Sequence, residues 1–200
     1  MAKQLSKNTT IIGVDEVGMG SLAGPVVVCA VSISARYKIG DFGVTDSKKL
    51  SPKQRETCVT KIKKLNIKYQ IALCHPKTID KLNIYQASRK AMRRALTPLI
   101  PLIDKGESRG IVLVDGNKKI PNLAFPQQAI INGDQKVFAI AAASILAKVY
   151  RDKMMFKYSK KYPQYGFERH KGYGTALHRA MFARYGPCTL HRKSFTIRAL

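Results

Sequence analysis

The sequence has few acidic residues and lacks cysteine-based motifs. Only 12 of its 200 residues are Asp or Glu, against 36 Lys and Arg, and Trp is absent. The four cysteines include no Cys-x-x-Cys pair of the kind that binds zinc or carries redox chemistry. We therefore expect reduced thiols, most of them buried, and a fold that needs no disulfide.

Signals for export or membrane insertion are also lacking. The first seven residues have no apolar core of a signal peptide, and the longest apolar stretch, from Leu22 to Ile33, is interrupted by Gly24 and Pro25. No basic amphipathic helix with a Trp, Phe or Leu face is evident. These absences favour a cytoplasmic protein that does not bind membranes.

Positive charge is in large excess. The formal net charge is +24, which favours a polyanionic partner and salt-sensitive association, and nucleic acid is the expected partner. Charge alone does not distinguish an enzyme from a non-catalytic basic nucleic-acid-binding protein, so this second class is the alternative to test.

The apolar pattern predicts a single α/β domain over residues 1–200, with residues 1–10 as a flexible N-terminal segment, because no linker or repeat interrupts the chain. Ser51, Pro52 and Gln54 are typical of a helix start. Runs of β-branched residues predict strands, and 3.6-residue periodicity predicts helices. We expect strands at 11–15, 26–33, 67–74 and 111–114, and helices at 52–65, 84–96, 137–158 and 175–185. This order favours a mixed sheet covered by helices.

Four of the scarce acidic residues stand beside glycine at strand ends or at a helix start: Asp15, Glu16, Asp115 and Asp134. Functional sites assemble at strand ends of α/β sheets. A cluster of carboxylates is repulsive unless the pKa values rise or a hard divalent cation binds, and oxygen ligands without nearby His or Cys indicate Mg²⁺ or Mn²⁺. Taken singly, each acid could instead cap a turn or a helix.

Asp15 and Glu16 raise a geometric question. Adjacent residues of a regular strand point to opposite faces. For both to reach one metal, we expect the strand to end or twist there, which Gly18 and Gly20 permit.

The segment Gly18, Met19 and Gly20 opens a G-x-G-x-x-x-G run that does not match the dinucleotide-binding fingerprint, and a strand is expected after it. This disfavours a nucleotide-cofactor enzyme. We expect a backbone surface without Cβ atoms that can approach a sugar and bond a 2′-hydroxyl.

Seven blocks of the sequence, in register over nearly the whole chain, resemble the type 2 ribonuclease H family, ribonuclease HII. They are residues 13–20, 46–50, 114–116, 133–136, 142–149 with 151–152, 170–173 and 191–195. The resemblance implies a ribonuclease H fold, with a five-stranded mixed sheet, flanking helices and a helical C-terminal part. It also implies that Asp15, Glu16, Asp115 and Asp134 are the metal-binding catalytic set.

The activity implied by the resemblance is endonucleolytic. The enzyme would cut 5′ to a ribonucleotide in RNA–DNA hybrids and in DNA duplexes with embedded ribonucleotides, by two-metal-ion hydrolysis that leaves a 5′-phosphate and a 3′-hydroxyl. We expect a monomer.

Substrate contacts are expected outside the acidic set. By resemblance, Tyr173 packs on the sugar beside the ribonucleotide. Lys48, Lys171 and Arg192 are plausible phosphate contacts, although any one cation in so basic a chain can be a solvated surface charge.

Met19 departs from the family, which usually has Arg between the two glycines. We expect weaker substrate binding rather than lost chemistry. His170, His178 and His191 lie away from the acids in sequence, and we expect no catalytic role for them.

Overall fold

The structure, a computed structural model, describes residues 9–65, 67–105 and 108–195. Most of the expected N-terminal segment, residues 1–8, lies outside the described residues, and Thr10 already pairs with Ser34 in the first strand. The strands are β1 (Thr10–Val17), β2 (Val26–Ser34), β3 (Lys68–Cys74), β4 (Asp104–Lys105), β5 (Ser108–Arg109), β6 (Ile111–Asp115) and β7 (Gln127–Ile130).

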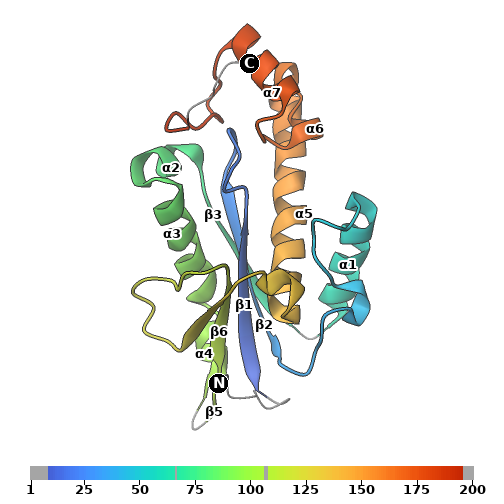
Figure 1. Ribbon diagram of the computed structural model, residues 1–200, viewed down its shortest axis with the longest axis vertical. Coiled ribbons are helices and arrows are strands. Elements are labelled where there is room, and N and C mark those ends of the chain that lie inside the picture. The colour runs from blue at the N-terminus through green and yellow to red at the C-terminus, as the bar shows by residue number, and fades with distance from the viewer. Residues whose placement is uncertain (1–8, 66, 106–107, 196–200) are drawn as a thin grey trace.

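Helices alternate with these strands and then form the C-terminal part (Figure 1). The α-helices are α1 (Pro52–Lys64), α2 (Pro76–Leu82), α3 (Ile84–Leu96), α4 (Ile100–Ile103), α5 (Phe138–Lys161), α6 (Phe167–His170) and α7 (Ala176–Tyr185). Three short 3-10 helices are η1 (Asp41–Gly43), η2 (Gly133–Gln135) and η3 (Pro163–Tyr165). The four predicted strands and four predicted helices are confirmed, with ends that differ by less than one helical turn.

The main sheet has the order β3-β2-β1-β6-β7. β1 is antiparallel to β2 and parallel to β6, and β6 is parallel to β7. This confirms the five-stranded mixed sheet. Because β1, β6 and β7 run in the same direction, their C-terminal ends share one edge of the sheet, where the predicted acids stand.

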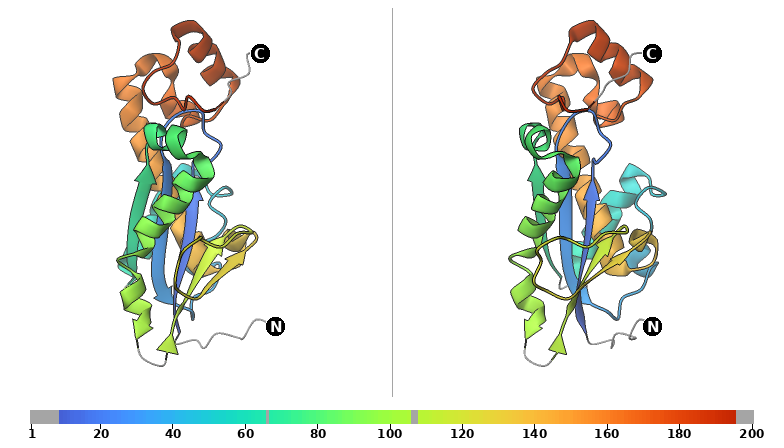
Figure 2. Two further views of the ribbon diagram at one scale, coloured as in Figure 1. Left: turned by 90° about the vertical axis from the view of Figure 1, so that its left-hand side faces the viewer. Right: turned by 60° about the vertical axis from the view of Figure 1, so that its left-hand side comes forward.

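Two helical layers cover the sheet, α5 on one face and α3 on the other (Figures 1 and 2). Alternate residues of β1 supply the two cores: Ile11 packs in the cluster that contains α5, and Ile12 packs in the cluster that contains α3. The C-terminal helices α6 and α7 gather beside the end of α5 (Figure 2). Within the described residues, no helix has the length and apolarity to span a membrane.

The expected helix start and thiols are both observed. Ser51 and Gln54 form a reciprocal capping box, in which each side chain accepts from the other residue's backbone N–H. The four cysteines are free thiols, and three of them are buried, with Cys188 partly exposed.

Close contact between β1 and α5 depends on Gly13. A Cβ atom added at Gly13 would lie 2.2 Å from the backbone carbonyl carbon of Ala139. The start of α5 is rich in small residues, and all of its residues from Phe138 to Ala147 are buried. Glycine and alanine together let the helix backbone rest directly on the strand.

We predict that Gly13→Ala destabilises the protein by about 1–3 kcal/mol or more, since the new methyl group meets backbone that cannot rotate away. Gly20→Ala is the matched control, because a Cβ at Gly20 meets nothing within 4 Å. Urea unfolding of both variants checks this. Equal midpoints for the two would show that α5 does not depend on Gly13.

Candidate active site

The parallel pairing of β1 with β6 sets two carboxyl groups side by side. Val14 pairs with Val114, so Asp15 and Asp115 are the next residues on neighbouring strands. Asp115 in turn pairs with Ile130 of β7, which leads to η2 and Asp134. The backbone N–H of Gly133 donates to Asp115 Oδ1 at 2.7 Å. Three predicted acids therefore meet at one edge of the sheet.

Asp15 and Glu16 point to opposite faces of the sheet. β1 does not end at this point, because Glu16 and Val17 still pair with β2. Of the two expected alternatives, an end or a twist of the strand, the end comes only at Val17, directly before Gly18. Asp15 lies on the α5 face, where the Ser144 hydroxyl bonds its carboxyl group, and Glu16 lies on the α3 face. The charge of Asp115 raises the pKa of both carboxyl groups.

Burial and mutual repulsion oppose ionisation of these groups. Burial raises the pKa of Asp15 well above its ordinary value, and the charges of Glu16 and Asp115 raise it further. Burial and Asp115 raise the pKa of Glu16 to about 7, against the opposing effect of Arg89. Burial, followed by Asp115, also raises the pKa of Asp134. A bound cation would relieve this unfavourable energy.

The carboxyl set fits a divalent metal by its chemistry. Glu16 Oε2 is buried and has no hydrogen-bond partner among the residues that the structure describes, and Glu16 and Asp115 both line a cavity of about 110 Å³. Among the described residues, no three Asp, Glu, His or Cys side chains already converge closely enough to hold a metal ion. Repulsion between like charges favours this spacing, and the orphaned oxygen supplies a free donor for a hard cation.

The loop over residues 46–50 closes the α5 side of the acidic cluster. Lys48 Nζ lies 3.8 Å from Asp134 Oδ2, and 82% of its side chain is exposed, so its ammonium can also reach a phosphate. Ser47 Oγ lies 2.9 Å from Ser144 Oγ, which connects the loop to Asp15. Sequence reasoning missed Ser47 and Ser144. Their position next to the predicted acids is visible only in the fold.

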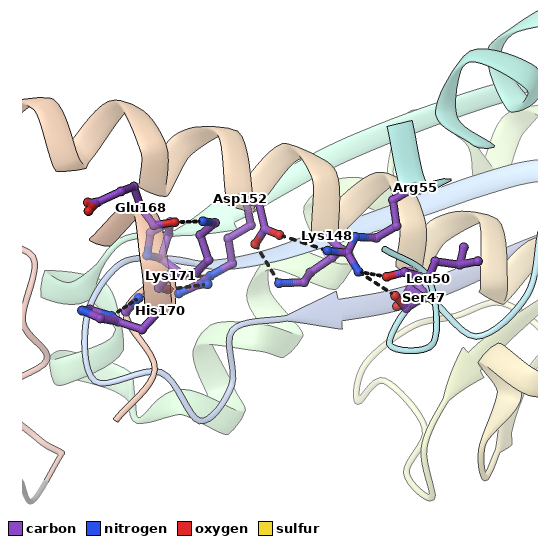
Figure 3. A network of polar contacts seen from close by, with 12 residues as sticks. Ser47, Leu50, Arg55, Lys148, Asp152, Glu168, His170 and Lys171 are labelled. Carbon is purple, nitrogen blue, oxygen red and sulfur yellow. Dashed lines mark hydrogen bonds and ion pairs between the residues drawn. The ribbon is translucent and has the colours of Figure 1, made fainter. Parts of the chain in front are cut away.

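Arg55 of α1 fixes this loop (Figure 3). Its guanidinium donates to the carbonyls of Ser47 and Leu50, at 3.0 and 2.6 Å, and lies 3.8 Å from an oxygen of Asp152. Lys148 also bonds Asp152, at 2.8 Å. Helices α1 and α5 thus hold the loop that carries Lys48.

Two buried arginines hold the backbone of residues 18–25 in place. Arg192 is 1% exposed and donates to the carbonyls of Gly18, Met19 and Gly24. Arg151 is fully buried and donates to the carbonyls of Ala23, Pro25 and Lys171. The prediction that Arg192 contacts phosphate is wrong, because its donors are directed at backbone oxygens and are shielded from solvent.

The remaining predicted contacts lie near the same segment. Tyr173 forms an isolated antiparallel bridge with Ser21, and its ring lies 5.3 Å from the Arg151 guanidinium. Lys171 is half-buried, and its ammonium donates to the Glu168 carbonyl. Gly20 is exposed, with open space where a Cβ would stand. The Met19 side chain lines the same cavity as Glu16. The chain from Gly18 to Ser21 therefore lies between the cavity that Met19, Glu16 and Asp115 line and the backbone bridge to Tyr173.

Sequence comparison agrees with this geometry. The family model described as Ribonuclease HII matches residues 12–198. Ribonuclease HII of Caldicellulosiruptor bescii is 51% identical over 185 residues, which cover 92% of this chain and 85% of that protein. Ribonuclease HII of Idiomarina loihiensis is 46% identical over 185 residues, with 92% and 94% covered.

Solved structures show the same fold. The ribonuclease H2 of Pyrococcus horikoshii superposes with a TM-score of 0.71 at 25% identity, over 94% of this chain and 95% of that one. The Archaeoglobus fulgidus ribonuclease HII, solved in a complex with PCNA, gives a TM-score of 0.76 at 24% identity, over 96% and 97%. With an acidic edge, a basic surface and this extent of similarity, the chain belongs to the ribonuclease HII family of metal-dependent endonucleases.

Proposed function

We propose that this ribonuclease HII hydrolyses the phosphodiester bond on the 5′ side of a ribonucleotide, in RNA–DNA hybrids and in DNA duplexes with embedded ribonucleotides. The proposed catalytic and metal-binding residues are Asp15, Glu16, Asp115 and Asp134. The observation that carries the proposal is the position of these acids at one edge of the sheet, where burial and repulsion raise the pKa of three of them. Family membership argues against a non-catalytic binding protein.

The cofactor in this proposal is Mg²⁺ or Mn²⁺. A hard divalent ion suits carboxylate oxygens, and the Bst ribonuclease HIII structure, which has this fold at a TM-score of 0.71 and 19% identity, contains Mn²⁺. Asp15, Glu16, Asp115 and Asp134 would hold two such ions, which would supply activation of water and stabilisation of the leaving 3′-oxygen. The products would carry a 5′-phosphate and a 3′-hydroxyl.

The protein's own groups orient the carboxylates. Ser144 holds Asp15, and the Gly133 N–H holds Asp115. Lys48 stands beside Asp134, where it can neutralise a phosphate close to the scissile bond. The proposed hydrolysis requires no covalent intermediate with the protein.

Recognition of the ribonucleotide is assigned to Gly18, Met19, Gly20 and Tyr173. Arg192 contributes by fixing the carbonyls of this segment rather than by touching phosphate. Exposed Gly20 leaves room for a sugar, and Tyr173 lies beside the segment through its bridge to Ser21. Lys171 stays a candidate phosphate contact. The expectation of a monomeric, cytoplasmic enzyme stays a prediction.

The direct test is cleavage of an end-labelled DNA duplex that contains one ribonucleotide. We expect a single nick 5′ to the ribonucleotide with Mg²⁺ or Mn²⁺, and none with EDTA. Asp15→Asn, Glu16→Gln, Asp115→Asn and Asp134→Asn should each lower kcat/KM by about 100-fold or more, because the lost carboxylates are the proposed ligands. Circular dichroism checks folding. Near wild-type turnover of Asp15→Asn, Glu16→Gln or Asp115→Asn at saturating metal would refute the assignment.

The raised pKa of Glu16 predicts a pH-dependent effect of Glu16→Gln on stability without metal. The folded state retains a proton that the unfolded state loses between about pH 4.5 and pH 7, so the wild-type protein loses stability as pH rises through this range. Glu16→Gln removes this loss. We expect the variant to be more stable by up to about 3 kcal/mol at pH 8 and equally stable at pH 4. Urea unfolding in EDTA measures this, and a difference independent of pH would contradict it.

Met19 and Gly20 separate two modes of sugar recognition. If backbone groups read the 2′-hydroxyl, Met19→Arg should tighten duplex binding by adding about one phosphate contact. The slope of log K against log salt concentration should then steepen by about one unit, and the cleavage site should stay the same. Gly20→Ala should lower ribonucleotide selectivity more than duplex affinity, because its methyl group enters the sugar's space and meets no protein atom. Mapping of the cleavage site and measurement of kcat/KM for both variants distinguish the two modes of recognition. A shifted cut or newly gained selectivity in Met19→Arg would assign recognition to the side chain.

A further inference from the structure

Three buried histidines form a connected cluster in the C-terminal part. They are His170 at the end of α6, His178 in α7 and His191 in the segment after α7. The rings of His170 and His178 stack with centroids 4.3 Å apart, and His178 Nε2 lies 3.1 Å from His191 Nε2. The proposed chemistry uses none of them.

The hydrogen bonds around the cluster fix where each proton resides. His191 Nδ1 accepts from the Cys188 N–H at 2.9 Å, so the His191 proton is on Nε2. That N–H donates to His178 Nε2, which leaves the His178 proton on Nδ1. His178 Nδ1–H then donates to the carbonyl oxygen of Tyr173 at 3.0 Å. The direction of donation therefore runs from Cys188 to Tyr173.

This arrangement requires neutral imidazoles. Burial, followed by the neighbouring His170, lowers the pKa of His178 to about 4. Burial likewise lowers the pKa of His191 and of His170. Near neutral pH the cluster therefore keeps its acceptor nitrogens, and the orientation of the His178 donor is preserved.

The cluster meets the site at the backbone around Tyr173. His170 Nδ1 accepts from the Gly172 N–H at 3.2 Å, and the Gly172 carbonyl accepts from the N–H groups of Leu22 and Ala23. Tyr173 bridges to Ser21. The histidines thus hold the strand-like contact between the Tyr173 backbone and the chain that follows Gly20.

We propose that His178, oriented by His191, is a positioning residue for Tyr173 in ribonucleotide recognition. Its Nδ1–H fixes the Tyr173 carbonyl, and this fixes the direction in which the Tyr173 ring leaves the backbone. The proposal rests on the function proposed above for Tyr173.

The matched variants are His178→Asn and His178→Gln. The Asn amide nitrogen can take the place of Nδ1 and keep the bond to Tyr173, whereas the Gln amide extends to the place of Nε2 and loses that bond. We expect His178→Asn to keep near wild-type kcat/KM on a duplex with one ribonucleotide. His178→Gln should lose about fivefold to tenfold, the usual effect of one hydrogen bond. Binding of an all-DNA duplex should be the same for both.

His191→Asn tests the same series of hydrogen bonds at a position farther from Tyr173. It replaces His178→Gln as the test if that variant does not fold. Its Oδ1 can still accept from the Cys188 N–H, but the donor to His178 is lost. His178 is then free to change tautomer, and we expect ribonucleotide kcat/KM to fall while binding of the all-DNA duplex is kept.

A Tyr173→Ala background separates positioning from general stability. If His178 acts through Tyr173, His178→Gln should cause no further loss of selectivity in that background. This proposal alone would be overturned if His178→Gln lowered ribonucleotide selectivity as much in the Tyr173→Ala background as in the wild-type protein. Equal losses of kcat/KM in His178→Asn and His178→Gln would also overturn it. Full ribonucleotide selectivity in Tyr173→Ala itself would overturn the assigned function of Tyr173, and this proposal with it.

Discussion

The burial of like-charged carboxyl groups beside one another is the constraint on which the site depends. Parallel pairing of β1 with β6 makes Asp15 and Asp115 neighbours, and the turn after β7 adds Asp134. Such a cluster is unfavourable in isolation, as the raised pKa of Asp15 indicates. The surrounding fold over-determines its geometry, since Gly13 brings α5 onto β1 and Ser144 with it. The repulsion that opposes ionisation of these carboxyl groups also favours the binding of a divalent cation.

Two buried arginines support the part of the site that follows β1, at residues 18–25. Arg192 donates to the carbonyls of Gly18, Met19 and Gly24, and Arg151 of α5 donates to those of Ala23, Pro25 and Lys171. These bonds join α5 and the C-terminal segment to residues 18–25. Charge-assisted bonds to carbonyls satisfy guanidinium groups that have left water. The protein therefore places acids at the proposed reaction centre and uses two of its many cations as internal supports.

Sequence periodicity predicts a long element best where one face is apolar, as in α3 (Ile84–Leu96). The start of α5 lacks such a stripe because it is buried on all sides, and its run of small and apolar residues indicated the helix instead. It did not place β7 (Gln127–Ile130), whose strand character comes from pairing with β6 rather than from its own residues. The four acids could be proposed as site residues because acidic residues are scarce in this chain and these four lie close to glycines at strand ends or at a helix start. The burial of Arg192 and the contact of Ser144 with Asp15 could not be found, since both arise only when distant segments meet.

The most direct test of the account is the number of protons released when Mn²⁺ binds. Because Glu16 has a pKa of about 7 without metal, cation binding near pH 6.5 should expel its proton. Calorimetry in buffers of different ionisation enthalpy measures this number. We predict proton release near pH 6.5 that declines by pH 8.5, and weaker Mn²⁺ binding with less proton release in Glu16→Gln. Mn²⁺ binding that is independent of pH and unchanged in Glu16→Gln would contradict a metal site built from these carboxylates.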